Sequence, residues 1–208
     1  MTLPKLLIAT RNPGKKREIR QFLVDLSLAI VFLDDVGIYE SSQELKLETE
    51  STFEGNALAK AEFFQKRSIL PTVAEDSGIE VLSLGGAPGV RSRRFAMVPP
   101  GQNEDEANNR ELLRRLAGTP PERRGARYCS VAVFIKTLDA SPQVFEGSCQ
   151  GRITTEPQGT GGFGYDPLFH SHDLEKTFGE ATLEEKNVVS HRGRAFRALA
   201  EWLAENPL

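Results

Sequence analysis

The segment at residues 128–135 constrains the fold most, because it is the strongest strand signal in the chain. Its sequence, YCSVAVFI, is rich in β-branched residues, which pack well on a pleated sheet. Residues 144–149 follow after a short interval and are predicted to pair with this strand as a hairpin. Helical and strand patterns are mixed on both sides of the hairpin. We therefore expect an α/β fold whose sheet is not purely parallel.

The rest of the chain divides into short strands and amphipathic helices. A buried strand is predicted at residues 3–9 and a helix directly after it, with Asn12 at the N-cap and Pro13 at the first helical position. Further strands are predicted at residues 29–33, 72–74, 79–82 and 168–169, and a short one inside the polar loop at 34–52. Helices are predicted at residues 53–66 and 104–116, a helix or turn at 183–186, and a last helix from about Ser190.

The composition narrows the classes of function. A net charge of −3 and a pI near 5.7 argue against a broad nucleic-acid-binding surface, and the local arginine clusters are interpreted as solvated faces. No apolar stretch reaches the roughly 20 residues that span a bilayer, and the N-terminus does not have a secretory pattern. Cys129 and Cys149 do not have metal-ligand spacing. We expect a cytoplasmic protein that binds neither membranes nor nucleic acids.

The motif TGGFGYDP at residues 160–167 is the most informative stretch for function. Its glycines permit conformations and close approaches that a Cβ would block. Phe163, Tyr165 and Asp166 offer an aromatic ring, a phenol and a carboxylate to a planar polar ligand. A tight connection between two elements is the structural alternative.

The turn TRNPGK at residues 10–15 lies between a predicted strand and a predicted helix. Backbone N–H groups and the dipole at a helix N-terminus favour anions, and Thr10, Asn12 and Lys15 add donors and charge. The turn is neither a P-loop nor a dinucleotide-binding fingerprint. It therefore predicts either an anion site or an ordinary capped helix.

The segment EDSG at residues 75–78 places two adjacent carboxylates at a predicted strand end. Adjacent residues of an extended segment point to opposite sides, so one carboxylate is expected to face a given site. Such a carboxylate suits Mg²⁺, with Glu48 or Glu54 as a second ligand, or it orients and deprotonates a water. An aspartate that caps its own turn is the alternative.

Two further pairs of polar residues suit a ligand. Asn56 and Lys60 are four residues apart on a predicted helix and share a face, and the spacing alone favours the solvent surface for them. His191 and Arg192 stand at the start of the last helix. Their donors suit the oxo edge of a base or a phosphate.

Seven segments together resemble the inosine/xanthosine triphosphate pyrophosphatase family, which hydrolyses non-standard purine nucleoside triphosphates. They occur in the family's order and cover almost the whole chain, so the set is highly specific. The matching segments are AT-x-N-x-x-K at 9–15, TF-x-x-NA-x-x-KA at 52–61, EDSG at 75–78, GGAPGV at 85–90, GGFGYDP at 161–167, EK at 185–186 and SHRG at 190–193.

The resemblance implies a Mg²⁺-dependent attack of water that splits the triphosphate between its α and β phosphorus atoms. The products are a nucleoside monophosphate and pyrophosphate, and XTP, ITP and dITP are the implied substrates. The resemblance also implies one two-lobed domain over residues 1–208, with an elongated mixed β-sheet and flanking helices around a central cleft. The family usually forms homodimers.

The roles of single residues follow from the same resemblance. Asp76 is expected to bind the metal and to position or deprotonate the water, with Glu48 as the second metal-binding carboxylate. Ser77 is expected to contact the nucleotide, and Phe163 to stack on the base. The other substrate-binding residues that it implies are Thr10, Arg11, Asn12, Pro13, Gly14, Lys15 and Lys60 for the phosphates, and Gly164, Tyr165, Asp166, Lys186, His191 and Arg192 for the base and the sugar.

Two departures from the family pattern leave roles open. Glu75 stands where the family commonly has aspartate. Arg91 and Arg93 stand where an aromatic and a small residue are usual, and with Arg94 they either strengthen polyphosphate binding or only decorate the surface. A related septum-site type nucleotide pyrophosphatase and a nucleotide sensor without catalysis are the competing interpretations. A sensor would not need two metal-site carboxylates.

Overall fold

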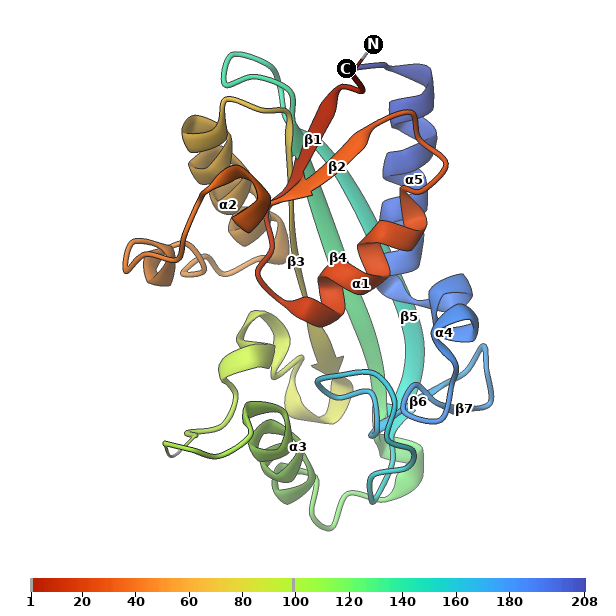
Figure 1. Cartoon of the computed structure of the whole chain (residues 1–208). Helices are drawn as coiled ribbons and strands as arrows, with labels where there is room; N and C mark the ends of the chain where they lie inside the picture. Colours follow the sequence, from red (N-terminus) through yellow and green to blue (C-terminus); the bar gives the residue numbers. More distant parts are fainter. Residues whose placement is uncertain (1, 99) are drawn as a thin grey trace. The chain divides into compact units, whose positions relative to one another are not determined.

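The computed structural model describes residues 2–98 and 100–208, which form a seven-stranded sheet with flanking helices (Figure 1). The strands are β1 (Lys5–Ile8), β2 (Ala29–Phe32), β3 (Thr72–Val81), β4 (Gly125–Ile135), β5 (Gln143–Ile153), β6 (Phe169–Ser171) and β7 (Lys176–Thr177). Their order in the sheet is β2-β1-β3-β4-β5-β6-β7. β1 pairs in parallel with β2 and β3, whereas β6 pairs antiparallel with β5 and β7. The predicted mixed α/β fold is therefore confirmed.

The helices begin at residues that can cap them. Asn12, Thr52, Asn103 and Thr182 each accept a hydrogen bond from a backbone N–H three residues further on. No helix in the described part of the chain is long and apolar enough to cross a membrane. The helices are α1 (Pro13–Phe22), α2 (Phe53–Ser68), α3 (Glu104–Arg115), α4 (Leu183–Val189) and α5 (His191–Glu205), and the 3₁₀ turns are η1 (Asp34–Val36), η2 (Glu44–Lys46), η3 (Leu82–Leu84), η4 (Gly89–Arg94) and η5 (Pro121–Arg123).

Two sequence predictions about strands were wrong, and one strand was missed. β3 is one continuous strand of 10 residues, so Glu75 and Asp76 lie in its middle and not at a strand end. The polar loop at 34–52 contains two 3₁₀ turns, η1 and η2, and the structure describes no strand there. The missed strand, β7, has two residues, which are too few to give a periodic signal.

The chain divides into two compact units. The first consists of Met1–Asp76, Ser130–Gly147 and Arg192–Leu208, and the second of Ser77–Cys129 and Ser148–His191. The three long strands β3, β4 and β5 contribute residues to both units. Each unit has its own hydrophobic cluster.

In the first unit, α1 and α5 pack side by side against the strands (Figure 1). Ile19 of α1, Leu23 directly after α1 and Phe196 of α5 are fully or almost fully buried there, and the centres of the Phe22 and Phe196 rings are 6.2 Å apart. This packing fixes the beginning of α1 next to the end of β1.

In the second unit, aromatic rings form the centre of the cluster. The Tyr128 ring lies 4.7 Å from that of Phe169, which is 5.0 Å from that of Phe178. Leu112 of α3 and Leu116 directly after α3 belong to the same cluster, and neither is exposed to solvent. The cluster supports the glycine-rich loop through Tyr165, which belongs to it.

Candidate active site

The turn between β1 and α1 in the first unit has the features of an anion site. The Asn12 side chain accepts a hydrogen bond from the backbone N–H of Lys15 at 2.9 Å, with Pro13 and Gly14 between them at the start of the helix. The Thr10 hydroxyl accepts from the backbone N–H of Asn12 at 3.3 Å. The first turn of α1 contains no acidic residue, so no carboxylate there offsets the positive end of the helix dipole.

Arg11 fastens the polar loop to this turn. Its guanidinium donates two hydrogen bonds of 2.7 Å to the Glu44 carboxylate, one of 3.1 Å to the carbonyl of Ile38 and one of 3.3 Å to Asp34. The hydrogen bond to Glu44 raises the pKa of Arg11. Arg11 therefore holds η1 and η2 against the start of α1, and its predicted contact with phosphate stays a prediction.

Asp76 lies at the centre of a buried polar cluster in the first unit. Its Oδ2 accepts from the Asn56 amide at 3.0 Å and its Oδ1 from the Lys60 ammonium at 2.9 Å. The same ammonium donates to Glu48 Oε1 and to the backbone carbonyl of Glu75, both at 2.9 Å. The two carboxylates that were predicted for a metal site are therefore brought together around one cation.

Asn56 and Lys60 do not form the polar surface that their spacing favoured. They are 1% and 8% exposed and point inward from α2, because the helix buries this face together with Ala57 and Ala61. Burial lowers the pKa of Lys60, but the charges of Asp76 and Glu48 outweigh it and raise the pKa overall. Lys60 is thus a firmly charged group beside Asp76.

Glu75 points to the other side of β3 from Asp76, as the alternation of an extended strand requires. Its carboxylate is 2.6 Å from the Lys15 ammonium, 2.8 Å from the Ser130 hydroxyl and 3.1 Å from the Arg192 guanidinium. Arg192 also pairs with Glu18. Burial raises the pKa of Glu75, but the charges of Arg192 and Lys15 outweigh it and hold the pKa well below its ordinary value.

Arg192 is 2% exposed and is held by the two carboxylates of Glu18 and Glu75 within the first unit. Its predicted contact with a base stays a prediction. Ser77 follows Asp76 in β3 and is the first residue of the second unit.

The glycine-rich loop of the second unit is organised by Asp166. Its Oδ2 accepts from the backbone N–H of Phe163 at 2.9 Å and from the Lys186 ammonium at 2.5 Å, and its Oδ1 from the Tyr128 hydroxyl at 3.4 Å. The Lys186 ammonium also lies 4.8 Å from the centre of the Phe163 ring. The half-buried Phe163 ring, the Lys186 ammonium and the Asp166 carboxylate therefore lie close together. Such a group offers a planar polar ligand a ring to stack on and charged partners for its edge.

His191 and Tyr165 make separate contacts within the second unit. The His191 ring stacks on Tyr128 at 4.4 Å with an angle of 4° between the planes. The Tyr165 hydroxyl donates to the backbone carbonyl of Ser92 at 2.7 Å, and burial raises the pKa of this phenol. Tyr165 is therefore a neutral donor that ties the loop to η4.

Sequence reasoning missed three residues of these clusters: Glu18, Ser130 and Tyr128. Each carried a signal. Glu18 lies three residues after Lys15 on α1, a spacing that places both on one face. Tyr128 and Ser130 are two residues apart in a strand, so they share a face of β4.

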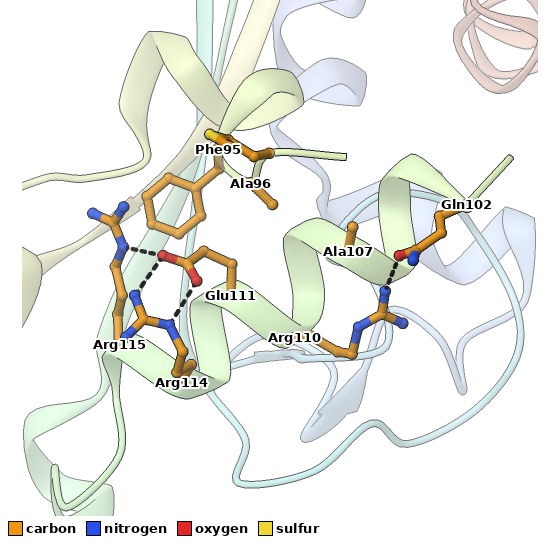
Figure 2. A pocket seen from close by; sticks show the side chains of 9 residues that line it. Phe95, Ala96, Gln102, Ala107, Arg110, Glu111, Arg114 and Arg115 are labelled. Carbon is orange, nitrogen blue, oxygen red and sulfur yellow. Dashed lines mark hydrogen bonds and ion pairs between the residues drawn. The ribbon is translucent and has the colours of Figure 1, made fainter. Parts of the chain in front are cut away.

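A cavity of about 490 Å³ lies elsewhere in the second unit, between α3 and the segment after η4 (Figure 2). Glu111 accepts hydrogen bonds from Arg114 and Arg115, which lower its pKa to about 2, and Arg110 donates to Gln102. The side chains of Arg110, Arg114 and Arg115 are exposed, which agrees with the interpretation as a solvated surface. We assign no ligand to this cavity. Its lining residues are Phe95, Ala96, Met97, Gln102, Ala107, Arg110, Glu111, Arg114 and Arg115.

Comparison with known proteins gives a consistent result over nearly the whole chain. The model of the Ham1 family matches residues 6–202. The dITP/XTP pyrophosphatase of Yersinia pseudotuberculosis is 41% identical over 204 residues, which cover 98% of this chain and 100% of the relative. The dITP/XTP pyrophosphatase of Symbiobacterium thermophilum is 45% identical over 203 residues, which cover 98% and 96%.

Solved structures agree with the sequence relatives. A HAM1 protein from Coxiella burnetii has a TM-score of 0.85 at 32% identity, with 98% of this chain and 100% of that chain covered. A nucleoside-triphosphatase / dITP/XTP pyrophosphatase from Mycobacterium abscessus has a TM-score of 0.71 at 40% identity, with the same coverage of both chains.

Proposed function

The chain belongs to the Ham1 family, and from this premise we propose that it is a pyrophosphatase of non-standard purine nucleoside triphosphates. Water cleaves XTP, ITP or dITP between the α and β phosphorus atoms, which yields the nucleoside monophosphate and pyrophosphate and removes these nucleotides from the pool. The observation that carries the proposal is one buried cluster, in which Asn56 and Lys60 donate to Asp76 and Lys60 also donates to Glu48.

Mg²⁺ is the proposed cofactor. The carboxylates of Glu48 and Asp76 both lie 2.9 Å from the Lys60 ammonium, so the two carboxylates are close enough together to share one cation. Mg²⁺ typically takes one or two protein carboxylates together with phosphate oxygens, and this donor set fits it. When bound, the ion neutralises charge on the polyphosphate. Glu75 is engaged by Lys15 and Arg192, and we assign it to holding those cations.

The protein's own groups account for the remaining chemistry. Asp76 orients the attacking water and accepts its proton, since a carboxylate within hydrogen-bonding reach is a competent general base. Lys15 and Lys60 neutralise the phosphates together with the N–H groups at the start of α1, which requires little reorganisation because these groups are already fixed. Thr10 and Asn12 keep that turn in shape.

The second unit is proposed to bind the base and the sugar. Phe163 stacks on the purine, and Lys186 and His191 offer donors to its edge. Hypoxanthine and xanthine carry a 6-oxo acceptor where adenine carries an amino donor, so buried donors are satisfied by the former and left unpaired by the latter. This difference is the proposed basis for the rejection of ATP.

We further propose that the enzyme is a cytoplasmic homodimer, as the family resemblance implies. Light scattering coupled to size-exclusion chromatography measures the mass of the assembly directly, and a mass of 23.0 kDa would mean a monomer.

The test of the function is pyrophosphate release from ITP, XTP, dITP, GTP, ATP and dTTP, each with Mg²⁺ and with a chelator. Metal-dependent turnover of the first three, far above the last three, is the expected result. Broad turnover would point to an altered substrate range, and no turnover with retained nucleotide binding would favour a sensor.

A further inference from the structure

The glycine-rich loop of the second unit is fixed by α3 as well as by Asp166. The backbone N–H of Gly164 donates to Asp105 Oδ2 at 2.7 Å. The backbone carbonyl of Gly164 accepts from the Asn109 amide at 3.0 Å. Asp105 and Asn109 are four residues apart, so they project from one face of α3 and hold both polar groups of a single residue.

The residue that is held in this way directly follows Phe163. Gly164 has φ +64°, a left-handed conformation that a chain adopts easily only at glycine. The backbone N–H of Phe163 is fixed at the same time by Asp166 at 2.9 Å. Three side chains therefore fix three polar groups of the backbone at Phe163 and Gly164, which restricts the backbone from which the Phe163 ring projects.

The surroundings of Asn109 indicate that its hydrogen bond to Gly164 does more than stabilise the fold. Its amide oxygen Oδ1 is buried and accepts no hydrogen bond within the described part of the chain. A buried acceptor without a partner costs free energy, so an apolar residue would serve packing better. What the asparagine provides at this position is its bond to Gly164.

We propose that Asp105 and Asn109 are positioning residues that hold the Gly164 peptide groups, and thereby the Phe163 ring, in the orientation that stacks on the purine base. This inference rests on the proposed function, in which Phe163 binds the base. Neither residue touches the substrate in this scheme. Both act through the loop.

Steady-state kinetics with ITP tests the proposal. Asp105→Ala and Asn109→Ala are each expected to raise KM about tenfold with kcat within about twofold, because a stacking contact is made in the ground state and in the transition state alike. Asp105→Asn keeps an acceptor oxygen and is expected to restore most of the wild-type KM. Glu106→Ala is the matched control, since it removes the same charge from the same helical turn and its partner is Arg110.

A double-mutant cycle separates positioning from a general effect on folding. In a Phe163→Ala background the KM effects of Asp105→Ala and Asn109→Ala should disappear, because there is no ring left to position. An unchanged KM in both single variants, or an effect that persists in full without the Phe163 ring, would overturn the proposal.

Calorimetric titration of ITP in the presence of a chelator gives a second readout that does not depend on turnover. If the wild-type protein binds ITP but releases no pyrophosphate, the proposed function fails while the positioning role is still decided by the Kd of the variants. A tenfold weaker Kd supports it, and an unchanged Kd rejects it.

Discussion

The ammonium of Lys15 lies 2.6 Å from the carboxylate of Glu75 in the polar network of the first unit, where Glu75 is buried and Lys15 is partly exposed. Lys15 stands in the first turn of α1 and Glu75 in the middle of β3. The pair thus joins the turn that is proposed to bind phosphate to the strand that carries Asp76. The surroundings lower the pKa of both groups, which disfavours the charged form of Lys15 and favours the charged form of Glu75. One prediction follows for each group.

Lys15→Arg should extend activity to higher pH. Burial lowers the pKa of Lys15, although Glu75 acts in the opposite direction, so its positive charge is lost at a lower pH than that of an ordinary lysine. The pKa of Lys60 is raised, so Lys60 stays charged over the same range. Arginine does not titrate there. We expect the fall of kcat/KM for ITP at alkaline pH to move to higher pH in Lys15→Arg and to stay at the same pH in Lys60→Arg. If the fall stays at the wild-type pH in Lys15→Arg, Lys15 is not its cause.

Glu75→Gln should destabilise the protein by about 3 kcal/mol at neutral pH, because it leaves the buried Arg192 and the partly exposed Lys15 beside a neutral group. The folded pKa of Glu75 lies well below its ordinary value. Its contribution is therefore present above pH 4.5 and is lost as the pH falls through the folded pKa. Denaturant unfolding at several pH values should show a difference from wild type that narrows in acid. Glu111→Gln is the control, since its pairs with Arg114 and Arg115 lie at the solvent surface and contribute little to stability.

The sequence predicted the elements of these sites better than their surroundings. The N-cap at Asn12 and the first helical position of Pro13 were correct, because capping is a local property that one turn of sequence specifies. The outward placement of Asn56 and Lys60 was wrong, because periodicity says which residues share a face but not what that face meets. Burial of Lys60 depends on Glu48 and Asp76, 12 and 16 residues away in the chain.

The role of Glu75 was beyond sequence reasoning for a related reason. Its partner Arg192 lies 117 residues further along the chain, and no local pattern connects the two. The alternation of β3 did predict that Glu75 and Asp76 would serve different sides. Only the tertiary structure showed that Glu75 faces Lys15 and Arg192, whereas Asp76 faces Asn56 and Lys60.

Asp76→Asn should abolish turnover and leave nucleotide binding largely intact. The amide keeps the shape of the side chain and one acceptor oxygen, which can replace the Oδ1 that accepts from Lys60, but it is a poor base for water. A loss of about 10²-fold to 10⁴-fold in kcat is expected. Pyrophosphate release and the Kd for ITP, measured on the same preparation, check this prediction. Full activity of the variant would remove Asp76 from the mechanism.

Arg192→Ala should both destabilise the first unit and narrow the preference for ITP over ATP. The loss of stability, about 3 kcal/mol, follows from the two carboxylates of Glu18 and Glu75 that would be left without their shared cation. The loss of preference follows from the family resemblance, which implies that Arg192 contacts the base. The two effects are separable, because a variant that unfolds more easily but keeps the full ITP-to-ATP ratio of kcat/KM would place base selection elsewhere.

Ile69→Gly should stabilise the protein by about 1 kcal/mol, because a β-branched residue is strained in the left-handed conformation that helix ends commonly assign to glycine. Ile69 ends α2 with φ 56° and donates its backbone N–H to the carbonyl of Gln65 at 2.8 Å. The side chain is 84% exposed, so its removal costs little burial, and the greater freedom of glycine in the unfolded chain offsets only part of the gain.

Val24→Gly is the matched control, since Val24 is 72% exposed and does not have a positive φ. Thermal unfolding should show a higher Tm for Ile69→Gly and a lower one for Val24→Gly. A lower Tm for both would mean that the relief of strain at Ile69 is smaller than the entropy that glycine adds to the unfolded chain.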